Sequence, residues 1–194
     1  MNLSKHIYPA VTLTVVLIVL VGIIYPLVMT GLSMVFFKEK AMGSLVEREG
    51  KIIGSRLIGQ PFSGAGYFHS RPSAAGSGYD ATASGGTNLG PTSRQLIEEQ
   101  VKERSKRLLA ENSNVAIPID LVTSSGSGLD PHISPAAAEF QVSRVAHERR
   151  MNEEKIKQLV QEHTERRQFG VLGEPRVNVL ELNLALDGAS KEGK

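Results

Sequence analysis

One uninterrupted uncharged segment constrains this 194-residue chain more than any other feature of its sequence. Between Lys5 and Lys38 there is no Asp, Glu, Lys or Arg, and most residues are aliphatic. As an α-helix, residues 7–37 would reach about 46 Å, whereas the hydrocarbon core of a bilayer is about 30 Å thick. The segment 7–37 is therefore predicted to cross a lipid bilayer, after a short N-terminal flank at 1–6.

A cleaved signal peptide is the alternative for this segment, because Lys5 supplies a positive charge ahead of it. Signal peptides carry an apolar region of only about 7–15 residues, followed by a cleavage site of small residues. The segment here is longer, residues 40–44 (KAMGS) match such a site poorly, and without cysteine no lipoprotein anchor can form. We predict one uncleaved span. Its orientation stays open, since Lys5 flanks one side and Lys38 and Lys40 the other.

Three residues inside the span are candidates for contact with a partner helix. Pro26 lacks a backbone donor and is expected to kink the helix. Gly22 and Gly31 would let a second helix approach closely, as small residues do within membranes. Glycines that simply face lipid are the alternative.

The rest of the chain is predicted to be one soluble domain at 38–187 with a polar tail at 188–194. From Ala41 to Lys194 it has 19 basic and 19 acidic residues, so it lacks the excess positive charge of a nucleic-acid-binding protein. The absence of cysteine also excludes disulfides, thiolate metal sites and a cysteine nucleophile.

Local signals in this domain predict helices and strands in the same chain, and therefore an α+β fold. Thr92 and Gln95 have the spacing of a capping box, Ser134-Pro135 that of a helix start, and Asn152 can cap a further helix. Aliphatic residues dominate the last candidate element, which is predicted as a strand. The predicted elements are a strand within 52–62, helices at 95–112, 135–150 and 153–167, and a strand at 174–187.

Residues 63–91 are rich in Gly, Ser, Ala and Pro, a composition typical of a flexible linker. Aromatic and polar side chains such as Tyr67, Phe68, Arg71 and Asn88 are interleaved in it, and a linker needs none of them. This favours an ordered functional loop, with a linker as the alternative.

A second polar loop, VTSSGSGLDPHISP at 122–135, raises three chemical possibilities. A Ser-His-Asp hydrolase could use Ser125 or Ser127 with His132 and either Asp130 or Asp120, but the G-x-S-x-G elbow is missing. Asp130 and His132 offer two metal ligands without a third nearby. Backbone amides at a helix start can bind an anion, although the loop lacks the lysine of a P-loop.

Two short stretches of the domain echo each other in sequence. Residues 83–91 (ASGGTNLGP) and 124–131 (SSGSGLDP) share a Ser-Gly start and a closing Pro, and each precedes a predicted helix. The echo indicates either two equivalent loops or chance in a Gly/Ser-rich sequence.

Three long stretches make the chain resemble a known family. They are GSRLIGQPF with YFHSRPSA and ASGGTNLGP within 54–91, IDLVTSSGSGLDPHISPAAAEFQVSRVA at 119–146, and LGEPRVNVLELNLALD at 172–187. In this order, after one span, they are similar to the C subunit of Kdp-type potassium-transporting P-type ATPases. The resemblance implies a non-catalytic accessory subunit, single-pass in a bacterial or archaeal plasma membrane, with its soluble domain outside the cytoplasm. The implied partners are a channel-like potassium-translocating subunit, a P-type ATPase subunit and a small membrane peptide.

The resemblance also implies candidate site residues. Proteins of this family have been proposed to act as a catalytic chaperone that raises the ATP affinity of the ATPase subunit, and the match AAAEFQVSRVA makes Gln141 the nucleotide contact. The neighbouring loop residues Ser125, Gly126 and Ser127 are nucleotide candidates with it, and ATP is expected only within the complex, with no cofactor bound independently. An extracytoplasmic domain conflicts with this role, because ATP is cytoplasmic.

Partner contacts are expected from loop residues of the soluble domain and from the span. The candidates in the loops are Arg71, Asn88, Asp130 and His132. The alternative function is a membrane-anchored extracytoplasmic hydrolase or ligand-binding module that uses the Ser/Gly-rich loops.

Overall fold

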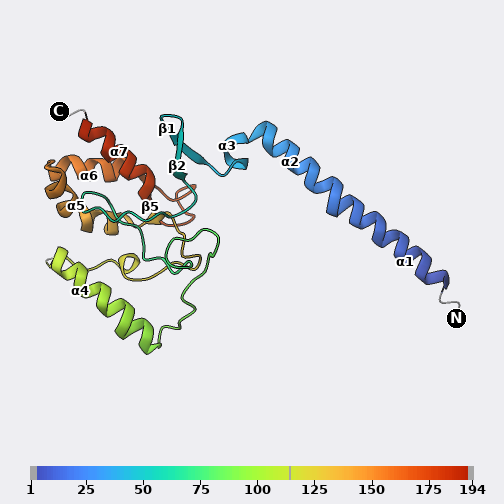
Figure 1. Ribbon diagram of the computed structural model, residues 1–194, viewed down its shortest axis with the longest axis horizontal. Helices are drawn as coiled ribbons and strands as arrows, with labels where there is room; N and C mark the ends of the chain where they lie inside the picture. The colour runs from blue at the N-terminus through green and yellow to red at the C-terminus, as the bar shows by residue number, and fades with distance from the viewer. Residues whose placement is uncertain (1–3, 114, 192–194) are drawn as a thin grey trace. The chain divides into compact units, whose positions relative to one another are not determined.

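The computed structural model describes residues 4–113 and 115–191 of the chain. Parts of the predicted flank 1–6 and tail 188–194 therefore lie outside the described residues. Contacts divide the chain into two compact units, Met1–Leu45 and Val46–Lys194. Figure 1 shows the elements of each unit.

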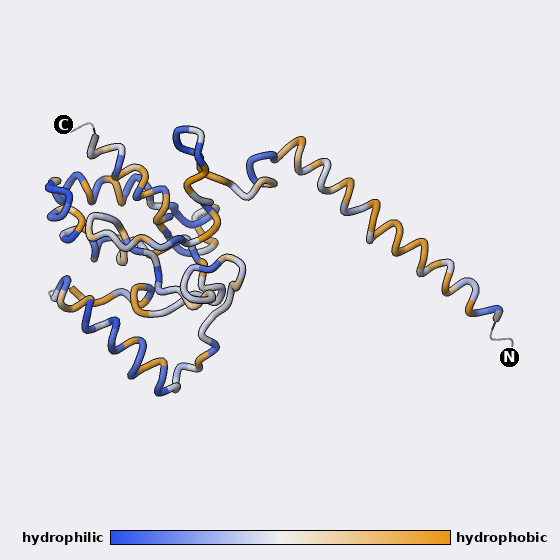
Figure 2. Tube along the Cα trace, in the orientation of Figure 1, coloured by the Kyte–Doolittle hydropathy of each residue, from blue (hydrophilic) through white to orange (hydrophobic). Residues whose placement is uncertain are grey.

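The N-terminal unit is a nearly continuous helix. It consists of α1 (Ser4–Leu17), a π-helical segment (Ile18–Ile24), α2 (Tyr25–Phe36) and the short α3 (Lys38–Ala41). Lys5–Phe36 forms a candidate membrane span with a mean hydropathy of 2.7, and Figure 2 shows apolar residues along this whole helix. None of the span's most apolar stretch is buried inside the structure, as expected for a surface that faces lipid or a partner helix.

Pro26 explains the π-helical segment that precedes it. In a regular α-helix the proline ring collides with the carbonyl of the residue four positions earlier, here Gly22. The backbone instead widens over Ile18–Ile24, and the Tyr25 amide bonds to the Leu20 carbonyl, five residues back. The predicted disturbance at Pro26 is therefore accommodated by a wider turn.

The second unit combines helices with two small sheets, which confirms the predicted α+β class. One sheet pairs β1 (Leu45–Arg48) with β2 (Lys51–Ser55). The other has the order β3-β5-β4, with both pairings antiparallel and His132 opposite Asn178. Its strands are β3 (His132–Ile133), β4 (Thr164–Glu165) and β5 (Arg176–Asn178). The helices are a π-helical segment (Gln95–Val101), α4 (Lys102–Glu111), a 3-10 turn (Ile119–Leu121), α5 (Pro135–Arg149), α6 (Glu153–Glu162) and α7 (Val179–Lys191).

Capping residues begin α5 and α6 where the sequence predicts them. The Ser134 hydroxyl accepts from the Ala137 amide at 3.1 Å, and the Asn152 side chain accepts from the Glu154 amide at 2.8 Å. At the first predicted helix the start is shifted by one residue. The Leu96 amide donates to the hydroxyl of Ser93 rather than Thr92, at 3.4 Å. The predicted cap by Thr92 is therefore wrong by one residue, because a serine hydroxyl caps a helix as well as a threonine hydroxyl does.

Two predicted elements are shorter than expected. Strand β2 ends at Ser55, since the Leu57 amide turns back to the Ser55 hydroxyl at 3.2 Å. Helix α6 ends at Glu162, because the next residues pair with β5 as strand β4.

The predicted strand at 174–187 is wrong. Only Arg176–Asn178 forms a strand, and from Val179 onward the chain is helix α7. The Asn178 side chain accepts from the Glu181 amide at 3.2 Å, which is an N-cap. The buried residues after it follow a helical period rather than alternation: Val179, Leu180, Leu182, Asn183 and Leu186. Leucine and alanine also favour helix over strand.

Helix α5 lies at the centre of the hydrophobic core. It packs against α6 and β5, and α6 packs against α7. Figure 1 shows α5, α6 and α7 grouped together in the second unit. Fully buried side chains of this core include Phe68, Phe140, Val142, Val145, Ile156, Leu182 and Leu186.

The Gly/Ser-rich segment 63–91 has a defined path, although it contains no helix or strand. Phe68 is wholly buried in the core. Asn183 of α7 holds its backbone on both sides: the Phe68 amide donates to the Asn183 side-chain oxygen and the Phe68 carbonyl accepts from its amide nitrogen, both at 2.9 Å. This agrees with an ordered loop rather than a linker.

Asn183→Ala is expected to lower the free energy of unfolding by about 2–4 kcal/mol, because it leaves an amide and a carbonyl of Phe68 buried without partners. The measurement is denaturant unfolding of the detergent-solubilised chain. Gln161→Ala, an exposed change on α6, is the control and should stay within about 0.5 kcal/mol of wild type. Equal stabilities for the two variants would contradict the role given to Asn183.

Candidate functional site

The two Ser/Gly-rich stretches that echo each other in sequence lie in contact. The Ser127 carbonyl accepts from the Gly85 amide at 2.9 Å and from the Ser84 hydroxyl at 3.0 Å. Gly128 has a φ of +68°, and a Cβ on it would lie 2.6 Å from both the Ala75 amide nitrogen and the Gly85 carbonyl oxygen. Glycine is therefore required where these loops cross.

Ser73 joins the same two loops through its hydroxyl. This group donates to the Gly128 carbonyl at 2.6 Å and accepts from the amides of Tyr79 and Ala75 at 2.7 and 3.2 Å. The Tyr79 hydroxyl in turn donates to the Arg71 carbonyl at 2.6 Å. Side chains thus supply the backbone partners that strands would otherwise provide.

Several amides of the predicted anion-binding loop are engaged within the loop itself. The Leu129 amide donates to the Ser127 hydroxyl at 3.1 Å, and the Asp130 amide to the Ser125 hydroxyl at 3.4 Å. The Gly128 amide donates to the Ser125 carbonyl at 3.2 Å. Gly126 and Ser127 are exposed. A phosphate contact by this loop stays a prediction, and it has to compete with these internal bonds.

Strand β3 is an edge strand whose outward amides are capped by carboxylates. Ile133 and Pro131 face β5, since Ile133 lies opposite Val177 and the Pro131 carbonyl accepts from the Val179 amide. The alternate amides of His132 and Ser134 point the other way. They donate to Asp130 at 3.0 Å and to Asp120 at 2.6 Å.

Arg71, Asp130 and His132, three of the predicted partner-contact residues, come together beside this strand. Arg71 Nη1 lies 3.3 Å and His132 Nδ1 lies 3.4 Å from the Asp130 carboxylate. They line one side of an open cavity of about 590 Å³, which Ile119, Glu174 and Arg176 border as well. The cavity mixes apolar and charged groups of both signs.

Burial raises the pKa of Asp130, but the hydrogen bonds from the His132 ring and amide and the positive charge of Arg71 outweigh it and hold the pKa below its ordinary value. Asp130 is therefore a stable anion rather than a proton donor or acceptor near neutral pH.

This cluster does not form the hydrolase triad considered from the sequence. Within residues 4–113 and 115–191, no hydrogen bond joins a serine hydroxyl to His132. Asp120, the other candidate acid, accepts from the amide and hydroxyl of Ser134 and so fixes the start of α5. Among the described residues there is also no group of three or more His, Asp or Glu side chains placed to hold a metal ion.

Gln141, the predicted nucleotide contact, is buried in α5 with an exposed fraction of 1%. Its side-chain oxygen accepts from the His69 amide and from Arg144, both at 2.8 Å. Its nitrogen donates to the His69 carbonyl at 3.2 Å and to the Ala137 carbonyl at 3.1 Å. All four hydrogen-bonding positions of the amide are occupied. A nucleotide contact stays a prediction that requires these bonds to be exchanged.

Arg144 extends this network to other elements. It pairs with Glu111 of α4 at 2.5 Å and donates to the carbonyls of Ala65 and Tyr67. Burial, and next the charge of Arg144, lower the pKa of His69, so its ring is neutral near pH 7.

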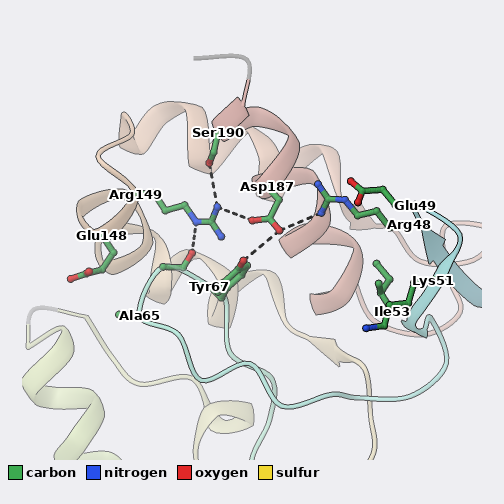
Figure 3. A pocket seen from close by; sticks show the side chains of 11 residues that line it. Arg48, Glu49, Lys51, Ile53, Ala65, Tyr67, Glu148, Arg149, Asp187 and Ser190 are labelled. Carbon is green, nitrogen blue, oxygen red and sulfur yellow. Dashed lines mark hydrogen bonds and ion pairs between the residues drawn. The ribbon is translucent and has the colours of Figure 1, made fainter. Parts of the chain in front are cut away.

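A group around Asp187 was missed by sequence reasoning. Figure 3 shows Arg149 and Arg48 converging on the Asp187 carboxylate, at 2.8 and 3.6 Å, beside Tyr67. The Arg149 guanidinium lies over the Tyr67 ring, 4.4 Å from its centre, and also donates to the Gly66 carbonyl at 2.6 Å. These residues line a cavity of about 1070 Å³ and hold β1, the 63–91 segment, α5 and α7 together. They are far apart in sequence, so no spacing signal points to them.

The remaining predicted contact residues are exposed. Gly22 and Gly31 lie on the surface of the span, and a Cβ added to Gly31 would meet nothing within 4 Å. Asn88 is exposed in a left-handed conformation, with a φ of +54°. Their roles in partner contact stay predictions.

Stability is expected to fall in acid partly because of Asp130. Its pKa is lower folded than unfolded, so its contribution is fully present above the unfolded pKa of about 3.9 and is lost as the pH falls through the folded value. Between about pH 6 and pH 3, the wild type should lose more unfolding free energy than Asp130→Asn, in denaturant titrations of the solubilised chain. Parallel pH profiles for the two proteins would contradict this assignment.

Comparison with known proteins adds a family to this geometry. Residues 7–188 match the family described as KdpC, the c chain of the K+-transporting ATPase. A potassium-transporting ATPase KdpC subunit from Koribacter versatilis is 59% identical over 186 residues, covering 96% of each chain. Relatives with the same name from Acidobacterium capsulatum and Bradyrhizobium diazoefficiens are 55% and 52% identical, covering 94% and 96% of this chain and 98% of each relative. The chain therefore belongs to the KdpC family, the c chains of potassium-transporting ATPases.

Proposed function

We propose that this chain is a non-catalytic accessory subunit that supports assembly of an ATP-driven potassium uptake complex. One observation carries the proposal: the polar groups that resembled catalytic machinery bind the domain's own backbone. Asp120 and Asp130 accept from the amides of Ser134 and His132, and the Gln141 side chain bonds to the amide and the carbonyl of His69. Groups committed in this way are poorly placed to attack or protonate a substrate.

The proposed partners are a channel-like potassium-translocating subunit, a P-type ATPase subunit and a small membrane peptide. The span provides the first contact surface, because Gly22 and Gly31 are uncovered along it. The complex would sit in a bacterial or archaeal plasma membrane, with the folded domain outside the cytoplasm. Any effect of this chain on ATP would act through the ATPase subunit of the complex, because a domain outside the cytoplasm does not contact cytoplasmic ATP.

The assembly role predicts a loss of complex when the chain is deleted. The P-type ATPase subunit is purified by a tag from cells with and without this chain, and potassium-stimulated ATP hydrolysis is measured. We expect reduced recovery of the channel-like subunit and loss of stimulation. Gly22→Leu should reproduce part of the loss by keeping a partner helix at a distance, whereas Val21→Ala, a neighbouring change in the span, is the control. Full recovery of the channel-like subunit and full potassium-stimulated ATP hydrolysis without the chain would contradict the proposal.

The second candidate function is a role of the chain in raising the ATP affinity of the ATPase subunit. Substitution of Gln141 distinguishes this function from the assembly role. If Gln141 only holds the domain together, Gln141→Ala should lower the unfolding midpoint of the purified chain by several degrees, because partly buried backbone groups of His69 lose their partner. The KM for ATP of the complexes that still assemble should be unchanged. A raised KM at normal recovery of the complex would instead assign Gln141 to the nucleotide.

A further inference from the structure

The loop between β4 and β5 ends in a tight turn with an aromatic residue at its apex. The Val171 amide donates to the Gln168 carbonyl at 3.2 Å, and the two residues between them, Phe169 and Gly170, have φ values of +53° and +76°. This combination defines a type I′ turn, which favours Asn, Asp or Gly at both central positions.

Phenylalanine is a poor choice for this turn on local grounds. A non-glycine residue with a bulky side chain is strained at positive φ. The ring gains nothing from burial to offset that strain, since Phe169 is 92% exposed. Neither the turn nor the core of this domain accounts for the residue, and strain of this kind points to a role outside the fold.

Two more apolar side chains stand beside Phe169. Val171 is 73% exposed and Leu172 is 56% exposed. We call these three residues, Phe169, Val171 and Leu172, the apolar knob. Three large apolar residues of this exposure within four positions differ from the single exposed apolar residues that occur on any protein surface.

The backbone of the knob is preorganised by local contacts. Gln168 and Leu172 exchange two backbone hydrogen bonds, both at 2.9 Å, which close the turn. At its base Arg167 pairs with Glu174 at 2.7 Å and Arg176 with Glu165 at 2.8 Å. A preorganised element loses little conformational entropy when it binds.

Of the three arginines near the knob, Arg166 is the one without a carboxylate partner among the described residues. Arg167 and Arg176 are neutralised by their carboxylate partners. Arg166 is exposed, and within the described residues it makes no ion pair. Phenylalanine and arginine are both enriched in protein–protein interfaces relative to the rest of the protein surface.

We propose that the apolar knob anchors the domain on another subunit of the same transport complex, in a concave apolar pocket with a carboxylate at its rim for Arg166. This inference rests on the proposed function as an accessory subunit. A protein pocket fits better than a bilayer surface, because a single unpaired arginine gives little attraction to anionic lipid, and rigidity benefits a fixed pocket more than a fluid interface.

Phe169→Asn tests the knob without harming the fold, since asparagine suits a type I′ turn. The purified full-length variant in detergent is titrated onto the other subunits, purified together from cells that lack this chain. We expect an unfolding midpoint equal to or above that of wild type and a Kd raised at least tenfold. Phe169→Leu should bind nearly as wild type, and Leu57→Asn, which removes a different exposed apolar side chain, should not change the Kd.

The outcomes separate the knob from the proposed function. If the wild-type chain does not bind the other subunits, both the accessory role and the proposed docking of the knob are contradicted. If wild type binds and Phe169→Asn binds equally, only the knob is overturned. A bilayer contact would replace the pocket if Phe169→Asn bound the subunits normally in detergent, but hydrogen exchange of the Val171 amide slowed on reconstitution into anionic lipid vesicles in the wild-type chain and not in the variant.

Discussion

Two buried carboxamides hold the irregular half of the soluble domain to its helical core. Asn183 of α7 and Gln141 of α5 bond to the amide and carbonyl of two consecutive residues, Phe68 and His69. Each amide side chain replaces the neighbouring strand that an extended segment would otherwise pair with. Because the segment 63–91 has no helix or strand, its buried backbone depends on such side chains. These two contacts therefore fix where the segment 63–91 crosses the helical core.

The same reliance on side chains explains why the loops of this domain contain residue types that catalytic sites also use. Ser73, Asp120 and Asp130 each bind backbone groups of the loops or of the start of α5. Serine, aspartate and histidine in a Gly-rich loop also make up hydrolase and metal sites, so composition cannot distinguish the two uses. Only the partners of each polar atom do so, and here most partners are main-chain amides and carbonyls.

Features governed by nearby residues were predictable, and those governed by distant ones were not. The apolar span and the caps at Ser134 and Asn152 rest on local physics, and each is found in the structure. The strand predicted at 174–187 failed because a dense aliphatic run fits either period, while the decisive signal, Asn178 three residues before Glu181, is brief. The Asn183 and Asp187 contacts join residues separated by more than one hundred positions, or by several elements, and no spacing in the sequence encodes them.

The carboxylates along strand β3 have a consequence for the time before the subunit meets its partners. An unprotected sheet edge offers free amides to any other extended chain and so invites aggregation. In β3 the outward amides of His132 and Ser134 are already bound to Asp130 and Asp120. The β3 edge of a newly made copy is therefore protected from pairing with an extended strand of a neighbouring copy. Asp120 and Asp130, which first suggested chemistry, would then protect this sheet edge from aggregation while the complex assembles.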